Sequence, residues 1–283
     1  MEYCIAKPMD AMTVISRTKS QLICKSFSIQ VKLRRAAFVA CISRWHRSFY
    51  QAIFPDDRDR YRVIRCGVDV DQWVPRLQPR SDDGPLRIVT VCRLVHKKGV
   101  DLLIDALHQF ASVYSRGVQL RIIGDGPERA ALEAQVRSLA FEKHVTWLGT
   151  MDNLAVREEL AAADLFALLC RVDRQGDQDG IPVALMEAMS CAIPVLAGNI
   201  PSVCELVEDR VTGSCLDATD VKVLVDRLQW LVDHPREAAE WAQCGRRRIQ
   251  EEFSLHVNVN RLEECFSTHI AAESSQNRGG LQP

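Results

Sequence analysis

The sequence predicts an α/β protein built on a parallel sheet with helices on both faces. From Leu86 onward, short apolar segments alternate with segments of helical periodicity. The strand-like segments are almost continuously apolar, as in parallel strands that are buried on both faces. A glycine or a charged residue follows most of them, and right-handed crossovers place such turns along one edge of the sheet.

Each element of this region follows from its local pattern. The first strand follows Gly84 and Pro85, and the helix after it, from about Lys98, carries apolar residues three or four positions apart. The expected strands are 87–92, 118–123, 144–149, 164–169 and 194–197. Further helices are expected after Pro127, over 153–163 and around Glu187. Together these elements predict a Rossmann-like domain over residues 83–250.

The two ends of the chain carry fewer signals. The expected elements are strands over 38–43 and 62–66 and helices over 44–53 and 253–266. Three prolines and a glycine in 72–85 predict a domain boundary, and the polar tail from Ala271 is expected to fray. The predicted domains are 1–75, 83–250 and 251–283.

Composition is that of a soluble globular protein, with 26% charged and 47% hydrophobic residues. The net charge of −1 hides an asymmetry, because residues 1–80 carry 15 Lys and Arg against 7 Asp and Glu, whereas the rest carries 21 against 30. The basic front is either a solvated face or a contact surface for anionic lipid headgroups or a phosphorylated acceptor. No nucleic-acid partner is predicted.

The eleven cysteines include no Cys-x-x-Cys pair and lie mostly in apolar runs. This pattern indicates buried reduced thiols rather than a disulfide framework or a zinc site. No signal peptide or membrane-spanning segment is predicted. We therefore expect a cytoplasmic protein, with peripheral contact at the inner membrane left open.

Two motifs carry the chemistry. Arg93 and Lys98 flank a predicted helix N-terminus, where backbone N–H groups and the helix dipole add to their charges to form an anion site. Asp179 and Glu187 stand eight positions apart across a glycine-proline turn, and each carboxylate can accept two hydrogen bonds from vicinal hydroxyls. The alternatives are a solvated basic loop, a loop acid and a surface helix residue. Three Asp in 171–179 lack the spacing of a metal site, and none is predicted.

Arg93-Leu-Val-His-Lys-Lys98-Gly99 together with the stretches 179–195 and 198–213 resembles the donor-binding half of GT-B glycosyltransferases. The similarity is to glycosyltransferase family 4, or group 1, which includes bacterial exopolysaccharide and colanic-acid-type enzymes, and it covers roughly 38–266. It implies a retaining hexosyltransferase with a nucleotide-diphosphate sugar donor, a polysaccharide or lipid-linked acceptor and no cofactor.

The resemblance also implies roles for individual residues. Arg93 and Lys98 would bind the diphosphate, Asp179 the sugar hydroxyls and Glu187 the ribose. Asp179 stands where the family usually has Glu, so the acid is one methylene shorter. The residues expected around the donor are Gly124, Gly126, Val145, Gly149, Gly180, Ile181 and Pro182.

The chain departs from the family in its first Rossmann-like half, of which residues 1–75 form only a part. We expect such a chain to bind donor weakly, to transfer sugar poorly or not at all, and to associate with a partner chain or a second copy. Two other functions stay open: a non-catalytic nucleotide-sugar binding module and a sugar-nucleotide epimerase.

Overall fold

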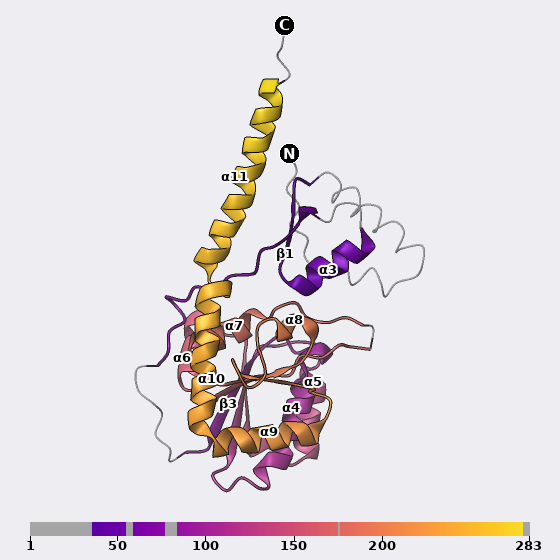
Figure 1. The fold of residues 1–283 in the computed structure, drawn as a ribbon. Coiled ribbons are helices and arrows are strands. Elements are labelled where there is room, and N and C mark those ends of the chain that lie inside the picture. Colours follow the sequence, from indigo (N-terminus) through magenta and orange to yellow (C-terminus); the bar gives the residue numbers. More distant parts are fainter. Residues whose placement is uncertain (1–35, 55–58, 77–83, 175, 280–283) are drawn as a thin grey trace. The chain divides into compact units, whose positions relative to one another are not determined.

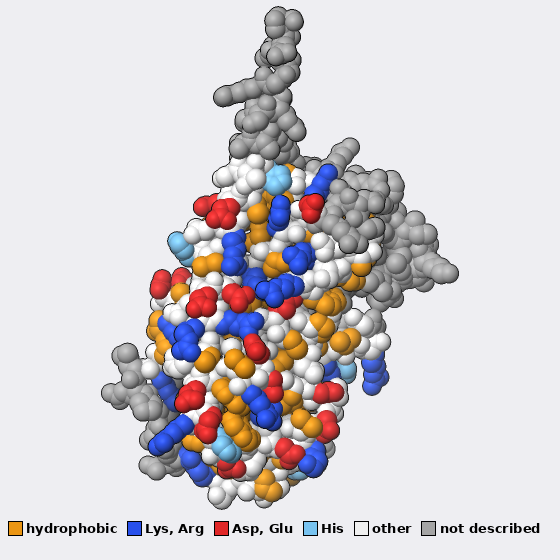
Figure 2. Space-filling view, viewed as in Figure 1, with side chains coloured by type: hydrophobic (Ala, Val, Ile, Leu, Met, Phe, Trp, Pro, Cys, Tyr) orange, Lys and Arg blue, Asp and Glu red, His pale blue; other side chains and the backbone are white. Residues whose placement is uncertain are grey.

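The computed structural model of the protein describes residues 36–54, 59–76, 84–174 and 176–279. The chain divides into two compact units, residues 70–251 and residues 1–69 with 252–283. Within the described part, no helix is long and apolar enough to cross a membrane. On the face seen in Figure 2, basic and acidic side chains are interspersed. Much of the predicted basic front precedes residue 36 and lies outside the described residues.

The larger unit is built on a six-stranded sheet whose neighbouring strands are all parallel (Figure 1). In spatial order the strands are β5 (Val145–Gly149), β4 (Val118–Ile123), β3 (Leu86–Val91), β6 (Leu165–Leu168), β7 (Val195–Gly198) and β8 (Ser214–Leu216). The predicted parallel α/β architecture is confirmed. The sequence analysis missed β8, which has only three residues.

Helices cover both faces of this sheet. Leu120 and Ile122 of β4 join one core cluster with residues of α4 (Val100–Ala111), α5 (Arg129–Ser138) and α9 (Val221–Asp233). Arg121 lies between them in the strand and so points to the opposite face, where its Nε lies 2.5 Å from Glu159 Oε2 in α6 (Asn153–Ala161). Helix α7 (Val183–Ser190) packs on β6 and β7.

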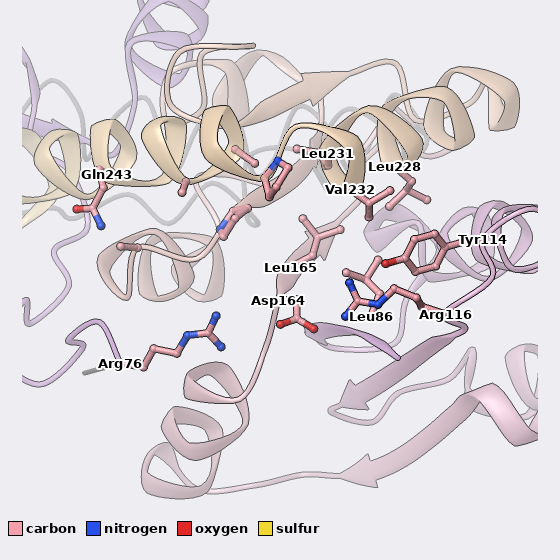
Figure 3. A pocket seen from close by; sticks show the side chains of 15 residues that line it. Arg76, Leu86, Tyr114, Arg116, Asp164, Leu165, Leu228, Leu231, Val232 and Gln243 are labelled. Atoms are coloured by element: carbon pink, nitrogen blue, oxygen red, sulfur yellow. The ribbon is translucent and has the colours of Figure 1, made fainter. Parts of the chain in front are cut away.

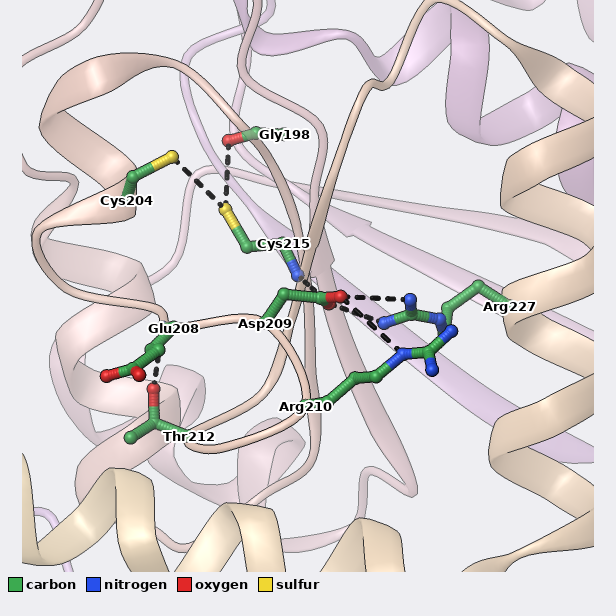
Figure 4. A network of polar contacts seen from close by, with 8 residues as sticks. All are labelled: Gly198, Cys204, Glu208, Asp209, Arg210, Thr212, Cys215 and Arg227. Carbon is green, nitrogen blue, oxygen red and sulfur yellow. Dashed lines mark hydrogen bonds and ion pairs between the residues drawn. The ribbon is translucent and has the colours of Figure 1, made fainter.

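The short edge strand β8 is held by a polar network (Figure 4). Asp209 Oδ1 accepts a hydrogen bond from the Cys215 N–H at 2.9 Å and lies 2.5 Å from Arg227 Nη1 of α9. At the end of α8 (Pro201–Cys204), Cys204 Sγ lies 3.7 Å from Cys215 Sγ. The cysteines in the described part of the chain are free thiols, as the sequence analysis expects, but only four of these nine are buried and Cys204 is exposed.

The smaller unit contains a parallel strand pair, β1 (Val39–Cys41) and β2 (Tyr61–Val63). Ser43 caps α3 (Arg44–Ile53), because its hydroxyl accepts the His46 N–H at 3.0 Å. The last helix, α11 (Leu255–Gly279), continues past Ala271, where the sequence analysis expects fraying; no Gly or Pro interrupts it before Gly279.

The remaining elements of the larger unit are η2 (His96–Lys98), η3 (Glu142–His144) and α10 (Pro235–Arg248), and η4 (Ile249–Phe253) spans the boundary between the two units in the sequence.

Candidate functional site

Most of the predicted site residues follow the carboxyl ends of the strands in the larger unit, whereas Val145 lies at the amino end of β5. The central strands β3 and β6 are neighbours, and the chain runs outward from them in opposite directions, through β4 and β5 on one side and β7 and β8 on the other. In open α/β sheets, ligands bind outside the carboxyl ends of the strands at such a topological switch point. The fold therefore selects the loops after β3 and β6 as the place to look for a ligand site.

Glycines let the loops at this edge pack backbone against backbone. Gly99 has a φ of +65°, and a Cβ there would collide with the carbonyl oxygen of Leu169, after β6. Gly124 has a φ of +124°, and a Cβ there would meet the carbonyl of Cys92, after β3. Contacts within the protein thus account for these glycines, and the nucleotide contact expected at Gly124 stays a prediction.

Lys98 and Asp179 form the central ion pair of the site. Lys98 Nζ lies 2.8 Å from Asp179 Oδ2, and only 16% and 14% of the two side chains is exposed. Burial by itself lowers the pKa of Lys98, but the adjacent Asp179 carboxylate raises it, and the net pKa lies above that of free lysine. The Cys170 thiol donates a hydrogen bond to the same carboxylate oxygen at 3.3 Å. The structure thus brings together two of the four predicted charged residues.

The acidic loop before α7 is tied to the loop after β3. Lys97 Nζ lies 2.9 Å from Asp177 Oδ2 and 3.5 Å from Asp179 Oδ1. Arg171 donates from its backbone N–H to the Lys97 carbonyl at 2.9 Å and from Nη2 to Asp101 Oδ2 at 2.7 Å. The sequence analysis assigned no role to Lys97 and did not single out Arg171, because their partners lie about 70–80 residues away in the chain.

The other two predicted charged residues stand apart from this pair. Arg93 is exposed, and among the described residues its side chain has no hydrogen-bond or ion-pair partner. Glu187 in α7 is half-buried and likewise has no described partner for its carboxylate. Burial raises the pKa of Glu187 to about 7. A half-buried acid without a cation is costly to ionise, so this position is suited to a group that donates hydrogen bonds to it.

The remaining predicted residues lie in turns and strand ends of the same unit. Gly149, at the end of β5, accepts the Gly124 N–H through its carbonyl at 2.7 Å, and Val145 begins that strand. Gly126 packs against the backbone of Leu94, after β3. The turn into α7 consists of half-buried Gly180 and buried Ile181 and Pro182. Ser202 of α8, which the sequence analysis did not single out, holds this turn by donating to the Asp179 carbonyl at 2.7 Å.

A cavity of about 290 Å³ lies elsewhere, at the amino ends of the strands (Figure 3). Its lining includes Leu86 and Leu165 at the starts of β3 and β6, with Arg76, Tyr114 and Gln243 around them. None of the predicted site residues lines it. In the described part of the chain, no group of three or more His, Cys, Asp or Glu side chains is placed to hold a metal ion.

The larger unit is a Rossmann-like domain with charged loops at its switch point, and comparison with known proteins identifies its family. The profile described as "Glycosyl transferases group 1" matches residues 71–248, and the chain belongs to this family. Its fold is of the GT-B type, as the resemblance implied.

Individual relatives agree with this assignment. A GDP-mannose-dependent alpha-(1-6)-phosphatidylinositol monomannoside mannosyltransferase from Mycolicibacterium smegmatis is 31% identical over 82% of the chain and 62% of its own length. The putative colanic acid biosynthesis glycosyltransferase WcaL of Escherichia coli is 33% identical over 72% of the chain and 50% of its own length. Anabaena Alr3699/HepE in complex with UDP matches with a TM-score of 0.74 at 22% identity, over 89% of the chain and 68% of that structure. The chain therefore spans about half to two thirds of the length of these relatives.

Proposed function

We propose that the chain is a retaining glycosyltransferase that moves a hexosyl group from a nucleotide-diphosphate sugar to a polysaccharide or lipid-linked sugar acceptor. The observation that carries the proposal is the Lys98–Asp179 pair, which joins a cation next to the N-terminus of α4 with a carboxylate at the switch point. Membership of the group 1 family supports it, as do relatives named for GDP-mannose and a structural neighbour that holds UDP.

In the proposed reaction, the bond between C1 of the sugar and the phosphate oxygen breaks, the acceptor hydroxyl oxygen bonds to C1, and the hydroxyl proton passes to the leaving diphosphate, on which negative charge grows. Arg93, Lys98 and the first N–H groups of α4 stabilise that charge. Asp179 accepts hydrogen bonds from hydroxyls of the sugar, and Glu187 from the ribose hydroxyls. Because two cations already balance the diphosphate, we propose neither a metal ion nor a cofactor.

Calorimetry with UDP and GDP, compared with uridine and guanosine, tests the donor site. Arg93→Ala and Lys98→Ala should each weaken diphosphate binding, by about 10–100-fold for a charge-assisted hydrogen bond, and leave nucleoside binding almost unchanged. Lys222→Ala is the control, because Lys222 is 83% exposed and forms its ion pair with Asp226 in its own helix. Equal losses for diphosphate and nucleoside would contradict the diphosphate assignment.

Product analysis separates the proposed transferase from the two alternatives. Transfer requires an acceptor, epimerisation proceeds without one, and a non-catalytic binding module turns over neither donor. A panel of UDP-glucose and GDP-mannose with sugar and lipid-linked acceptors should therefore give product only when donor and acceptor are both present.

A further inference from the structure

Four charged side chains of alternating sign form a row at the switch point. The row runs from Lys98 to Asp179, Lys97 and Asp177, with nitrogen–oxygen distances of 2.8, 3.5 and 2.9 Å. The two oxygens of Asp179 are divided between the lysines, since Oδ2 faces Lys98 and Oδ1 faces Lys97. The side chains of Lys97, Lys98 and Asp179 are only 14–16% exposed, so the pairs between them are weakly screened by solvent, whereas Asp177 is 37% exposed.

The proposed function places two demands on Lys98. In the row it neutralises Asp179, whereas a bound donor would draw the ammonium to its diphosphate. If Asp179 had no other cation, binding would leave a largely buried carboxylate without a compensating charge, which is energetically costly. A second cation that stays with Asp179 removes this conflict.

Lys97 is built to stay in place. Asp177 holds its ammonium at 2.9 Å, and its carbonyl accepts the Arg171 N–H at 2.9 Å. Asp177 is itself fixed, because its N–H donates to Asp173 Oδ1 at 2.8 Å and its carbonyl accepts the Asp173 N–H at the same distance. The Cys170 thiol also donates a hydrogen bond to Asp179, but a thiol is a weak donor and carries no charge.

We infer that Lys97 is a positioning residue for sugar recognition, an inference that rests on the proposed function. When Lys98 binds the donor diphosphate, Lys97 keeps the Asp179 carboxylate paired and oriented so that it accepts hydrogen bonds from hydroxyls of the hexosyl group. The Asp179 side chain has a single methylene and cannot reach far. The orientation of its carboxylate toward the sugar therefore depends on the cation that pairs with it. Lys97 touches neither the sugar nor the phosphates in this arrangement.

The experiment measures dissociation constants of matched pairs, UDP with UDP-glucose and GDP with GDP-mannose, for the full chain and its variants. Lys97→Met should weaken binding of the nucleotide-sugar by about tenfold, the scale of one charged hydrogen bond, and change the binding of the nucleoside diphosphate far less. Lys98→Met should weaken both members of a pair. Lys97→Arg should restore the ratio between them, because the guanidinium can still bridge Asp177 and Asp179.

Thermal unfolding of each variant separates misfolding from the expected effect, and the Lys97→Arg rescue gives a reading in a folded protein. Equal weakening of diphosphate and nucleotide-sugar by Lys97→Met would overturn the inference and leave the proposed function standing. If Lys97→Met changed neither of the two affinities, the inference would also be overturned. If the wild-type chain binds no member of either pair, the proposed function fails, and this inference fails with it.

Discussion

At its carboxyl edge, the sheet of the larger unit ends in charged loops that pack on one another, whereas its amino edge borders a cavity of about 290 Å³. The same central strands, β3 and β6, contribute to both edges. Below the strand starts, α9 and α10 leave space that side chains such as Leu231 and Ala238 only partly fill. In this domain the cavity and the predicted charged site residues therefore lie at opposite edges of the sheet.

The glycine variants of the two edges offer the largest contrast. Gly99→Ala at the carboxyl edge should lower the free energy of unfolding by about 3 kcal/mol or more, because the new methyl collides with the Leu169 carbonyl and the φ of +65° is itself unfavourable. Gly117, at the amino edge, has a φ of +76°, but its Cβ would meet only Pro85 at 3.9 Å. Gly117→Ala should therefore cost only the strain, about 1–2 kcal/mol.

Urea denaturation followed by tryptophan fluorescence checks this difference. Gly149→Ala is a further control at the carboxyl edge, since its φ is +68° and nothing lies within 4 Å of the added Cβ. If all three variants lost the same stability, close packing between the loops at the carboxyl edge would be excluded as the cause.

More of the fold than of the candidate site could be predicted from the sequence. Apolar periodicity identified five strands of the sheet, because each buried strand needs an apolar run, but three-residue β8 leaves no such run. The motifs linked Arg93 with Lys98 and Asp179 with Glu187, whereas the ion pair in the structure joins one residue of each motif, Lys98 with Asp179. The contact from Lys97 to Asp177 depends on loops that meet only in the folded chain, so no local pattern marks it.

Glu187 should make the stability of the larger unit depend on pH. Its pKa rises from 4.5 to about 7 on folding because burial disfavours the charged form. The folded state then holds the proton more tightly, so this contribution to stability is complete below pH 4.5 and is lost as the pH rises through 7. Glu187→Gln should accordingly be more stable than wild type at pH 8 and differ little at pH 5, as measured by the unfolding temperature. A constant difference across this range would contradict the raised pKa.

The same variant tests the proposed ribose contact. Wild type should prefer a ribonucleoside diphosphate over its 2′,3′-dideoxy analogue, because an ionised carboxylate accepts hydrogen bonds from both hydroxyls. Glu187→Gln should reduce this preference by about tenfold, since a neutral amide accepts weaker bonds. Competition binding at pH 8, where Glu187 is largely ionised, gives the cleanest comparison. An unchanged preference would assign Glu187 a purely structural role.

The smallest effect is expected from Arg76, one of two arginines at the amino-edge cavity. Arg76 lines that cavity, and its Nη1 donates to the Ala163 carbonyl at 3.4 Å. Strand β3 has six residues, so the two edges are separated by about 20 Å, whereas the Debye length at physiological salt is about 8 Å. Arg76→Met should therefore leave the affinity for UDP and GDP unchanged in calorimetry at 0.15 M salt, the physiological ionic strength. A loss as large as that of Lys98→Ala would move the nucleotide to the cavity and make its volume, rather than the charged loops, the guide to the ligand site.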